Sequence, residues 1–406
     1  MTVAVAIAGL VFLILIHEAG HFFVARGVAM KPRKFYIFFP PAIWKRTRNG
    51  IEYGIGAIPL GGYVKIPGMH RPAAGDLTAH MEPAVAEDPG LRDDVAAVAS
   101  ALDAERLDDA RLRLEDLREE VGSAGLSEQA GKSAQRGLTE IGDALASDAY
   151  WRAPAWKRVA VIFAGPGVNL VFAVLLLWVV FMLGVPDHVT SGVGTVGKGT
   201  AAATSGLQAG DEVVRVNGRA VTADTLSDAI QKGKGAPVTL TVRRDGELVV
   251  LRATRPTKEG GRWILGFTRD VAYKSYGPVD SFGQAVQETW NVTSLTGSAL
   301  GHIVTGQDRD QVSSPVGIVQ GSSEALSYDY RIYLRILALI SLSLALLNLL
   351  PLLPLDGGHI AFSLLEKARG RAIPRVAYER YSALGLALVL MLFFLGLSND
   401  VGNLGG

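Results

Sequence analysis

Cysteine is absent from all 406 residues of this chain, so disulfide bonds and thiolate metal sites are excluded. Charged residues are scarce, at 19% of the chain, and 40 basic residues nearly balance 39 acidic ones. A net charge of +1 leaves no dominant basic face, so the chain is not expected to be a dedicated nucleic-acid binder. The sequence also lacks a Gly-rich phosphate loop and any repeat array.

Hydrophobic residues make up 49% of the chain and gather in four long segments. Each segment is long enough to cross a bilayer, which predicts a polytopic α-helical membrane protein with about four transmembrane helices. The first segment is too long for the core of a signal peptide and no basic residue precedes it, so we expect it to be retained. The four segments are 2–25, 159–185, 336–355 and 381–398.

Basic residues cluster on one side of this predicted topology, which should therefore be cytoplasmic. Both termini and the region 186–335 are then extracytoplasmic, although Arg331 and Arg335 count mildly against this orientation. The clusters that decide it are Arg26 to Arg48, then Arg152, Lys157 and Arg158, and finally Lys367, Arg369, Arg371, Arg375 and Arg380.

The first apolar segment contains an HExxH motif formed by His17, Glu18 and His21. Residues four apart share one face of a helix, so both imidazoles can hold one zinc ion while Glu18 lies beside it. Ionisable groups are costly at membrane depth and usually face a protein interior or a wet cavity. Two histidines satisfied only by hydrogen bonds are the structural alternative to a metal site.

A zinc site of this kind needs a third protein ligand. Asp356 follows the third apolar segment and should reach the same, cytoplasmic side of the membrane as His17 and His21. Two alternatives remain open: Asp356 could cap a helix broken at Gly357, and His359 could compete as the ligand.

Five motifs, in this order, resemble the site-2 protease family of intramembrane zinc metalloproteases, and specifically its bacterial members with an extracytoplasmic PDZ domain. The resemblance covers residues 17 to about 400 apart from one insertion. The motifs are HEAGH at 17–21, IPLGGYVKI at 58–66, FAGPGVN at 163–169, SSPVGI at 313–318 and NLLPLLPLDGGH at 348–359.

The resemblance implies hydrolysis of peptide bonds with Zn²⁺ held by His17, His21 and Asp356, and with Glu18 as general base. It also implies that Asn348 and Asn169 help to position the substrate. A plain helix–helix hydrogen bond is the alternative for either asparagine.

Residues 51–66 alternate and turn like a β-hairpin, and the resemblance places this hairpin against the membrane near the zinc. We expect its edge, with Gly61 and Gly62 as substrate-binding candidates, to pair with an extended substrate strand. A plain cytoplasmic hairpin is the alternative.

The predicted domains follow from these features. Residues 1–70 hold the first span and the hairpin, 71–150 a cytoplasmic helical insertion, and 151–185 the second span. Residues 186–270 resemble one small α+β PDZ domain through SGLQAGDEVVRVNG at 205–218. Residues 271–335 form a juxtamembrane linker, and 336–406 hold spans three and four. Within the insertion, apolar periodicity over 91–102 and 107–121 predicts an amphipathic helix or two, and a further helix is expected from Leu126 to about Leu145. The insertion could gate access, dock a partner or be a solvated appendage.

The expected function is a zinc-dependent intramembrane endopeptidase of the bacterial inner membrane. By family analogy its substrates are single-span proteins such as anti-sigma factors or remnant signal peptides, with an upstream site-1-type protease as a further partner. The first alternative is a catalytically silent PDZ protein that retains partners, and the intact Glu18 argues against it. A transporter is disfavoured because the sequence has no inverted repeats.

Overall fold

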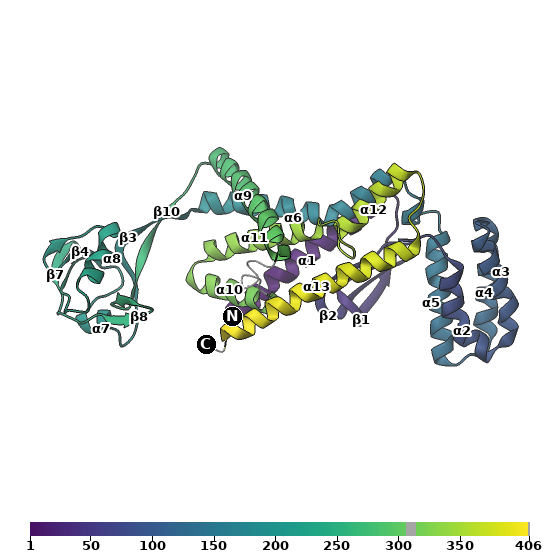
Figure 1. Cartoon of the computed structure of the whole chain (residues 1–406), viewed down its shortest axis with the longest axis horizontal. Helices are drawn as coiled ribbons and strands as arrows, with labels where there is room; N and C mark the ends of the chain where they lie inside the picture. The colour runs from purple at the N-terminus through teal and green to yellow at the C-terminus, as the bar shows by residue number, and fades with distance from the viewer. Residues whose placement is uncertain (306–313, 405–406) are drawn as a thin grey trace. The chain divides into compact units, whose positions relative to one another are not determined.

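The computed structural model describes residues 1–305 and 314–404. Within this part of the chain, four helices are long and apolar enough to cross a membrane, which confirms the predicted polytopic membrane protein. Figure 1 shows these helices running alongside one another. They are α1 (Thr2–Gly27), α6 (Ala155–Leu183), α11 (Tyr330–Asn348) and α13 (Arg375–Leu404).

The third span lies earlier in the sequence than the predicted 336–355. Asp329 caps α11 by accepting a hydrogen bond of 2.8 Å from the Arg331 backbone N–H, so the helix begins at Tyr330. It ends at Asn348 because Pro351 and Pro354 cannot continue a regular helix. The chain then turns into α12 (Asp356–Arg369).

The spans approach each other closely around α1. A side chain at Gly20 would overlap the backbone of Ala164 in α6, so only glycine permits this contact. The Tyr333 hydroxyl on α11 donates to the Val5 carbonyl at 3.1 Å. The same helix reaches α6 through Ser341, whose hydroxyl donates to a backbone carbonyl of that helix at 2.9 Å.

The hairpin differs from the prediction. Its strands are β1 (Lys34–Arg48) and β2 (Ile51–Lys65), so 51–65 is one strand and the placing of the whole hairpin within 51–66 was wrong. The turn is Asn49-Gly50, with φ of 52° and 75°, the left-handed conformation that two-residue hairpin turns require. Strand β1 was not predicted because Pro40, Pro41 and several basic residues interrupt the alternation of apolar and polar residues in it.

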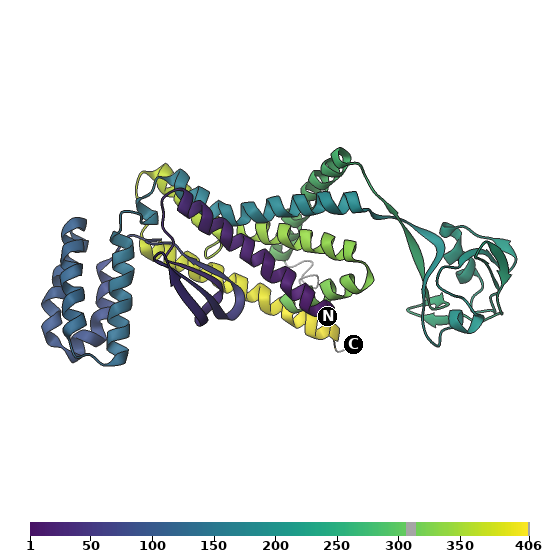
Figure 2. The same ribbon diagram turned by 180° about the vertical axis from the view of Figure 1, so that it is seen from behind.

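The register of the hairpin leaves two open edges. Residues 34–37 lie between 52–55 and 62–65, so that Tyr36 is opposite both Gly54 and Tyr63. Among the described residues no further strand joins this sheet. Residues 42–48 therefore form one edge and residues 62–65 the other, and Figure 2 shows the hairpin beside α1.

The insertion is a four-helix bundle, drawn in blue in Figure 1. Its core includes Leu77, Met81, Val98, Leu117 and Leu138, all fully buried. Three of its helices lie where the apolar periodicity predicts them, whereas the first, interrupted by Pro83, was not predicted. The elements are α2 (Ala74–Glu87), the 3-10 turn η1 (Pro89–Leu91), α3 (Arg92–Asp103), α4 (Leu107–Ser123) and α5 (Glu128–Leu145).

Ion pairs join this bundle to the base of the hairpin. Asp143 of α5 accepts from Arg33 at 2.9 Å and from Lys65 at 2.7 Å. Asp148 accepts from the same Arg33 at 3.0 Å. The short 3-10 turn η2 (Tyr150–Arg152) continues the link, since the Tyr150 backbone N–H donates to the Pro67 carbonyl at 2.9 Å.

Two further helices are α9 (Pro278–Thr305) and α10 (Pro315–Tyr328). Ser314 caps α10 and itself donates to Asp400 of α13. Residues 306–313 of the predicted linker, including Ser313 of the SSPVGI motif, lie outside the described residues.

Residues 177–285 form a separate compact unit. Its main sheet has the order β10-β3-β4-β6-β7 with β5 beside β4, and helix α8 packs on it over an apolar core. The strands and helices α7 and α8 lie within 185–274 and form a small α+β domain, while the rest of the unit is the end of α6 and the start of α9. The identity of this domain as a PDZ domain stays a prediction. The elements are β3 (Val185–Val196), α7 (Ala201–Ser205), β4 (Glu212–Val216), β5 (Arg219–Ala220), α8 (Ala223–Lys232), β6 (Leu240–Arg244), β7 (Glu247–Val250), β8 (Thr257–Glu259), β9 (Arg262–Ile264) and β10 (Phe267–Lys274).

Candidate metal centre

Two histidines meet on one face of α1. His17 and His21 are one helical turn apart, and their side chains are 10% and 8% exposed. Their Nε2 atoms lie 3.2 Å from each other. Two buried imidazole nitrogens this close must share either a hydrogen bond or a cation.

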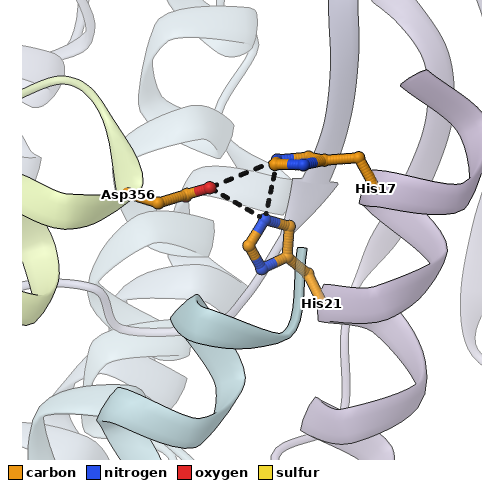
Figure 3. Close-up of side chains that lie close together, drawn as sticks. All are labelled: His17, His21 and Asp356. Carbon is orange, nitrogen blue, oxygen red and sulfur yellow. Dashed lines mark hydrogen bonds and ion pairs between the residues drawn. The ribbon is translucent and has the colours of Figure 1, made fainter. Parts of the chain in front are cut away.

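Asp356 approaches the same point from the other end of the chain. Its Oδ2 lies 3.2 Å from Nε2 of His17 and 3.3 Å from Nε2 of His21, as Figure 3 shows. Asp356 stands in the first turn of α12 but makes no capping hydrogen bond there. The arrangement therefore favours a ligand over the helix-capping alternative.

The three atoms fit a zinc ion. In a tetrahedral site with bonds of about 2.0–2.1 Å, ligand atoms lie about 3.3 Å apart. The observed separations of 3.2, 3.2 and 3.3 Å form such a triangle. Asp356 Oδ2 is buried and has no hydrogen-bond partner among the described residues, which is the state expected of an oxygen directed at a metal. His359 is not part of this cluster.

Groups on α6 orient the two imidazoles. His21 Nδ1 lies 2.9 Å from the Val161 carbonyl, which can only accept, so this nitrogen carries the proton and Nε2 keeps its lone pair for a metal. His17 Nδ1 lies 3.4 Å from the Asn169 side-chain amide. Asn169 is fully buried and its Oδ1 has no partner among the described residues, so the flipped amide would let Oδ1 accept the Nδ1 proton of His17.

Glu18 lies beside the pair and against the hairpin. A side chain at Gly62 would overlap the Glu18 carboxylate, so the edge of β2 passes directly over it. Gly165 of α6 is equally close to the ring of His21. Both glycines permit a backbone approach that no other residue allows.

The predicted site residues therefore fall into two groups. The structure brings His17, Glu18, His21 and Asp356 together, with Asn169 and Gly62 in contact with them. Gly61 precedes Gly62 on β2 and lies against Phe39. Asn348 donates to the Leu344 carbonyl of its own helix at 3.0 Å, and no described contact joins it to the ligands.

Sequence reasoning did not identify Val161 and Gly165 as part of the site. Val161 contacts His21 through its backbone carbonyl, which every residue type has, so the identity of this residue could not indicate its role. Gly165 stood within the motif at 163–169, and a glycine inside an apolar span is a sign of close helix packing.

Comparison with known sequences gives a consistent set of relatives. Residues 5–392 match Peptidase family M50. Protease RseP of Yersinia pestis is 30% identical, with 99% of both chains covered. Regulator of sigma-E protease RseP of Salmonella typhimurium is 28% identical, with 99% of this chain and 98% of the relative covered. A Brucella suis protein named as a zinc metalloprotease is 29% identical, with 97% of this chain and 93% of the relative covered.

Proposed function

The chain belongs to Peptidase family M50, the site-2 proteases, and is a multi-pass zinc metalloprotease of the inner membrane; from this premise we propose that it cuts single-span proteins within or beside their membrane helices. The observation that carries the proposal is the buried triangle of His17, His21 and Asp356, with Glu18 on the same face of a helix able to cross a membrane.

The chemistry assigns each side chain a role. Zinc, when bound, acts as a Lewis acid toward the scissile carbonyl and lowers the pKa of water. Glu18 accepts the proton of the attacking water and returns it to the departing amine. Val161 and Asn169 hold the histidine rings in the orientation in which Nε2 faces the metal.

Substrate binding follows from the position of β2. A membrane helix hides its peptide bonds in backbone hydrogen bonds, so a substrate must be held extended to be cut. Residues 62–65 form an open strand edge, and Gly62 places this edge over Glu18. An unwound substrate segment adds to this edge as a further strand, which brings its peptide bond to the base. Proline in place of Tyr63 or Val64 should then abolish cleavage, and full activity would contradict strand addition.

Substrates and orientation are the finer part of the proposal. The basic clusters support an orientation in which the hairpin and the bundle are on the cytoplasmic side of the membrane and residues 185–274 are outside. That unit serves as a PDZ filter that admits substrates after an upstream protease has trimmed their outer portion. Because the Salmonella typhimurium relative is named Regulator of sigma-E protease RseP, anti-sigma factors are the first candidates, with remnant signal peptides beside them.

The decisive experiment compares the wild-type protein with Glu18→Gln in detergent, measuring zinc content and cleavage of a labelled single-span substrate. We expect equal zinc in both proteins and a loss of cleavage of about 10²–10⁴-fold in the variant, because the general base is gone. Leu112→Gln, on an exposed face of the bundle, is a control that should change neither quantity.

Equal cleavage by wild type and Glu18→Gln would overturn the role of Glu18. Well-folded wild type without zinc would overturn the metal centre. Either result would favour a silent binding protein that retains partners.

A further inference from the structure

A second cavity, of about 470 Å³, lies away from the metal centre. Three segments line it: residues 69–73 after the hairpin, residues 151–158 at the start of α6, and residues 366–378 between α12 and α13. All three belong to the unit that contains the spans. The proposed protease function assigns no role to this cavity.

The cavity has an excess of positive charge. Its lining includes Arg71, Lys367 and Arg371, which are exposed. Among the residues that the structure describes, no carboxylate lies within ion-pair distance of these three cations. Arg71 is held in place by stacking over Trp151, with its guanidinium 5.0 Å from the ring centre.

A buried arginine in the wall carries a free donor. Arg158 is only 9% exposed and pairs with Glu366 through Nη1 at 2.6 Å. Its Nε is buried and has no hydrogen-bond partner in the described part of the chain. Glu366 is the single acid that lines the cavity and is already engaged by this pair. The cavity therefore presents three cations without an ion pair and has behind them a buried guanidinium N–H without an acceptor, a donor set suited to phosphate oxygens.

The start of α6 lines the same cavity through Ala155 and the preceding Pro154. The N-terminus of this 29-residue helix adds the positive end of a helix dipole to the four basic side chains.

The cavity lies where two candidate spans begin, which is where lipid headgroups are expected. Pro154 and Ala155 open α6, and Tyr378 belongs to the first turns of α13. Trp156 and Tyr381, next to them in sequence, are 61% and 58% exposed, as expected of aromatic side chains at a membrane interface. We propose that this cavity binds the phosphate group of an anionic phospholipid, with Arg71, Arg371 and Arg158 as its main donors.

This site is separate from the metal centre. Helix α12 carries Asp356 in its first turn and Glu366 ten residues later, a separation of roughly 15 Å along the helix axis. Failure of the lipid proposal would leave the protease proposal untouched, and Glu18→Gln should bind lipid as the wild type does.

The test uses the full chain in phosphatidylcholine nanodiscs with spin-labelled phosphatidylglycerol or spin-labelled phosphatidylcholine as the probe. We expect wild type to immobilise phosphatidylglycerol preferentially, and Arg71→Gln with Arg371→Gln to reduce that preference roughly tenfold. The lysine pair, Arg71→Lys with Arg371→Lys, should keep most of it. Arg92→Gln with Arg136→Gln removes the same charge from exposed positions on the bundle and should have no effect.

Equal preference in wild type and in the glutamine pair, with native circular dichroism, would overturn the proposal. The same would follow if the control pair lost as much preference as the cavity pair. A second arm titrates inorganic phosphate into lipid-free protein in detergent. Tight phosphate binding without any preference for phosphatidylglycerol would assign the site to free phosphate and overturn the lipid as its source.

Discussion

At the scale of single residues, Gly62 decides how close the hairpin comes to the catalytic base. A methyl group there would overlap Glu18, so Gly62→Ala should displace the carboxylate while leaving the zinc ligands in place. We expect a loss of cleavage of roughly 10²-fold, since misplacement by about 1 Å has that effect. Zinc content should be unchanged. Gly27→Ala, on the same helix as Glu18 but with open space around it, is the matched control. Unimpaired cleavage by Gly62→Ala would show that β2 is not in contact with the base.

Substitution of Asn169 should change zinc affinity, whereas substitution of Asn348 should not. Asn169 contacts His17 and is fully buried, so Asn169→Ala should weaken zinc binding by about 10–100-fold, as loss of a residue that orients a metal ligand does. Asn348→Ala should leave zinc affinity unchanged, because that side chain bonds within its own helix. Competition with a chelator measures both affinities. The interpretation fails if Asn169→Ala holds zinc as tightly as the wild type.

Among the elements, the helical bundle is tied to the strand that lies over the site. Asp143 accepts from Arg33, which precedes β1, and from Lys65, the last residue of β2. Asp143→Asn should therefore loosen the hairpin base by about 1 kcal/mol, a typical value for partly exposed ion pairs. Hydrogen exchange over residues 34–65 should become faster. Asp109→Asn removes ion pairs internal to the bundle and should leave that exchange unchanged. Equal exchange rates in all three proteins would mean that the bundle is an independent appendage.

The small α+β unit should lose stability in acid through Asp211. This buried carboxylate accepts from Arg244 at 2.7 and 2.8 Å. Burial alone would raise its pKa, but the hydrogen bonds from Arg244 and Gln208 hold the pKa below the ordinary value of 3.8. A lowered native pKa stabilises the fold above pH 3.8, and this stabilisation is lost as the pH falls through the native pKa.

Asp211→Asn should therefore destabilise the unit by about 2 kcal/mol at pH 7, the value of hydrogen bonds to a charged group. The difference from wild type should shrink toward pH 3. Hydrogen exchange of residues 177–285 in the full chain measures both points. A difference that stayed constant with pH would rule out the carboxylate as its cause.

The elements also show what sequence patterns can and cannot predict. The four spans could be predicted from long apolar runs, because a helix that crosses a bilayer must be both long enough and apolar enough. The hairpin was misplaced because β1 lacks clear alternation, while the Asn49-Gly50 turn that fixes it occupies only two residues. Helix α2 was missed because Pro83 interrupts its apolar pattern.

At the scale of the whole molecule, the absence of cysteine permits a direct test of orientation. Ser100→Cys in the bundle and Ala209→Cys in the small unit would each be the only thiol of the chain, and both positions are exposed. In intact spheroplasts, a membrane-impermeant maleimide should label Ala209→Cys and spare Ser100→Cys. Labelling of both after membrane disruption is the control. The opposite pattern would invert the proposed topology.

The sequence predicted the metal ligands of the site but not the backbone contacts around them. The HExxH spacing and the depth of Asp356 point to a common ligand set, because both can be read from local sequence and topology. The contacts of Val161 and Gly165 could not be, since they depend on the packing of α6 against α1, which one sequence does not determine.

The three metal ligands connect two distant parts of the chain. Two of them are on the first helix and the third is on α12, near the opposite end of the chain, and no disulfide can join these regions. A bound ion is then a reversible cross-link between α1 and α12. It closes a loop that contains most of the polypeptide, and the entropy lost by the unfolded chain on closing a loop grows with the length of that loop. Removal of zinc should therefore lower the force needed to pull α1 away from α12, so the ion that takes part in catalysis also stabilises the tertiary structure.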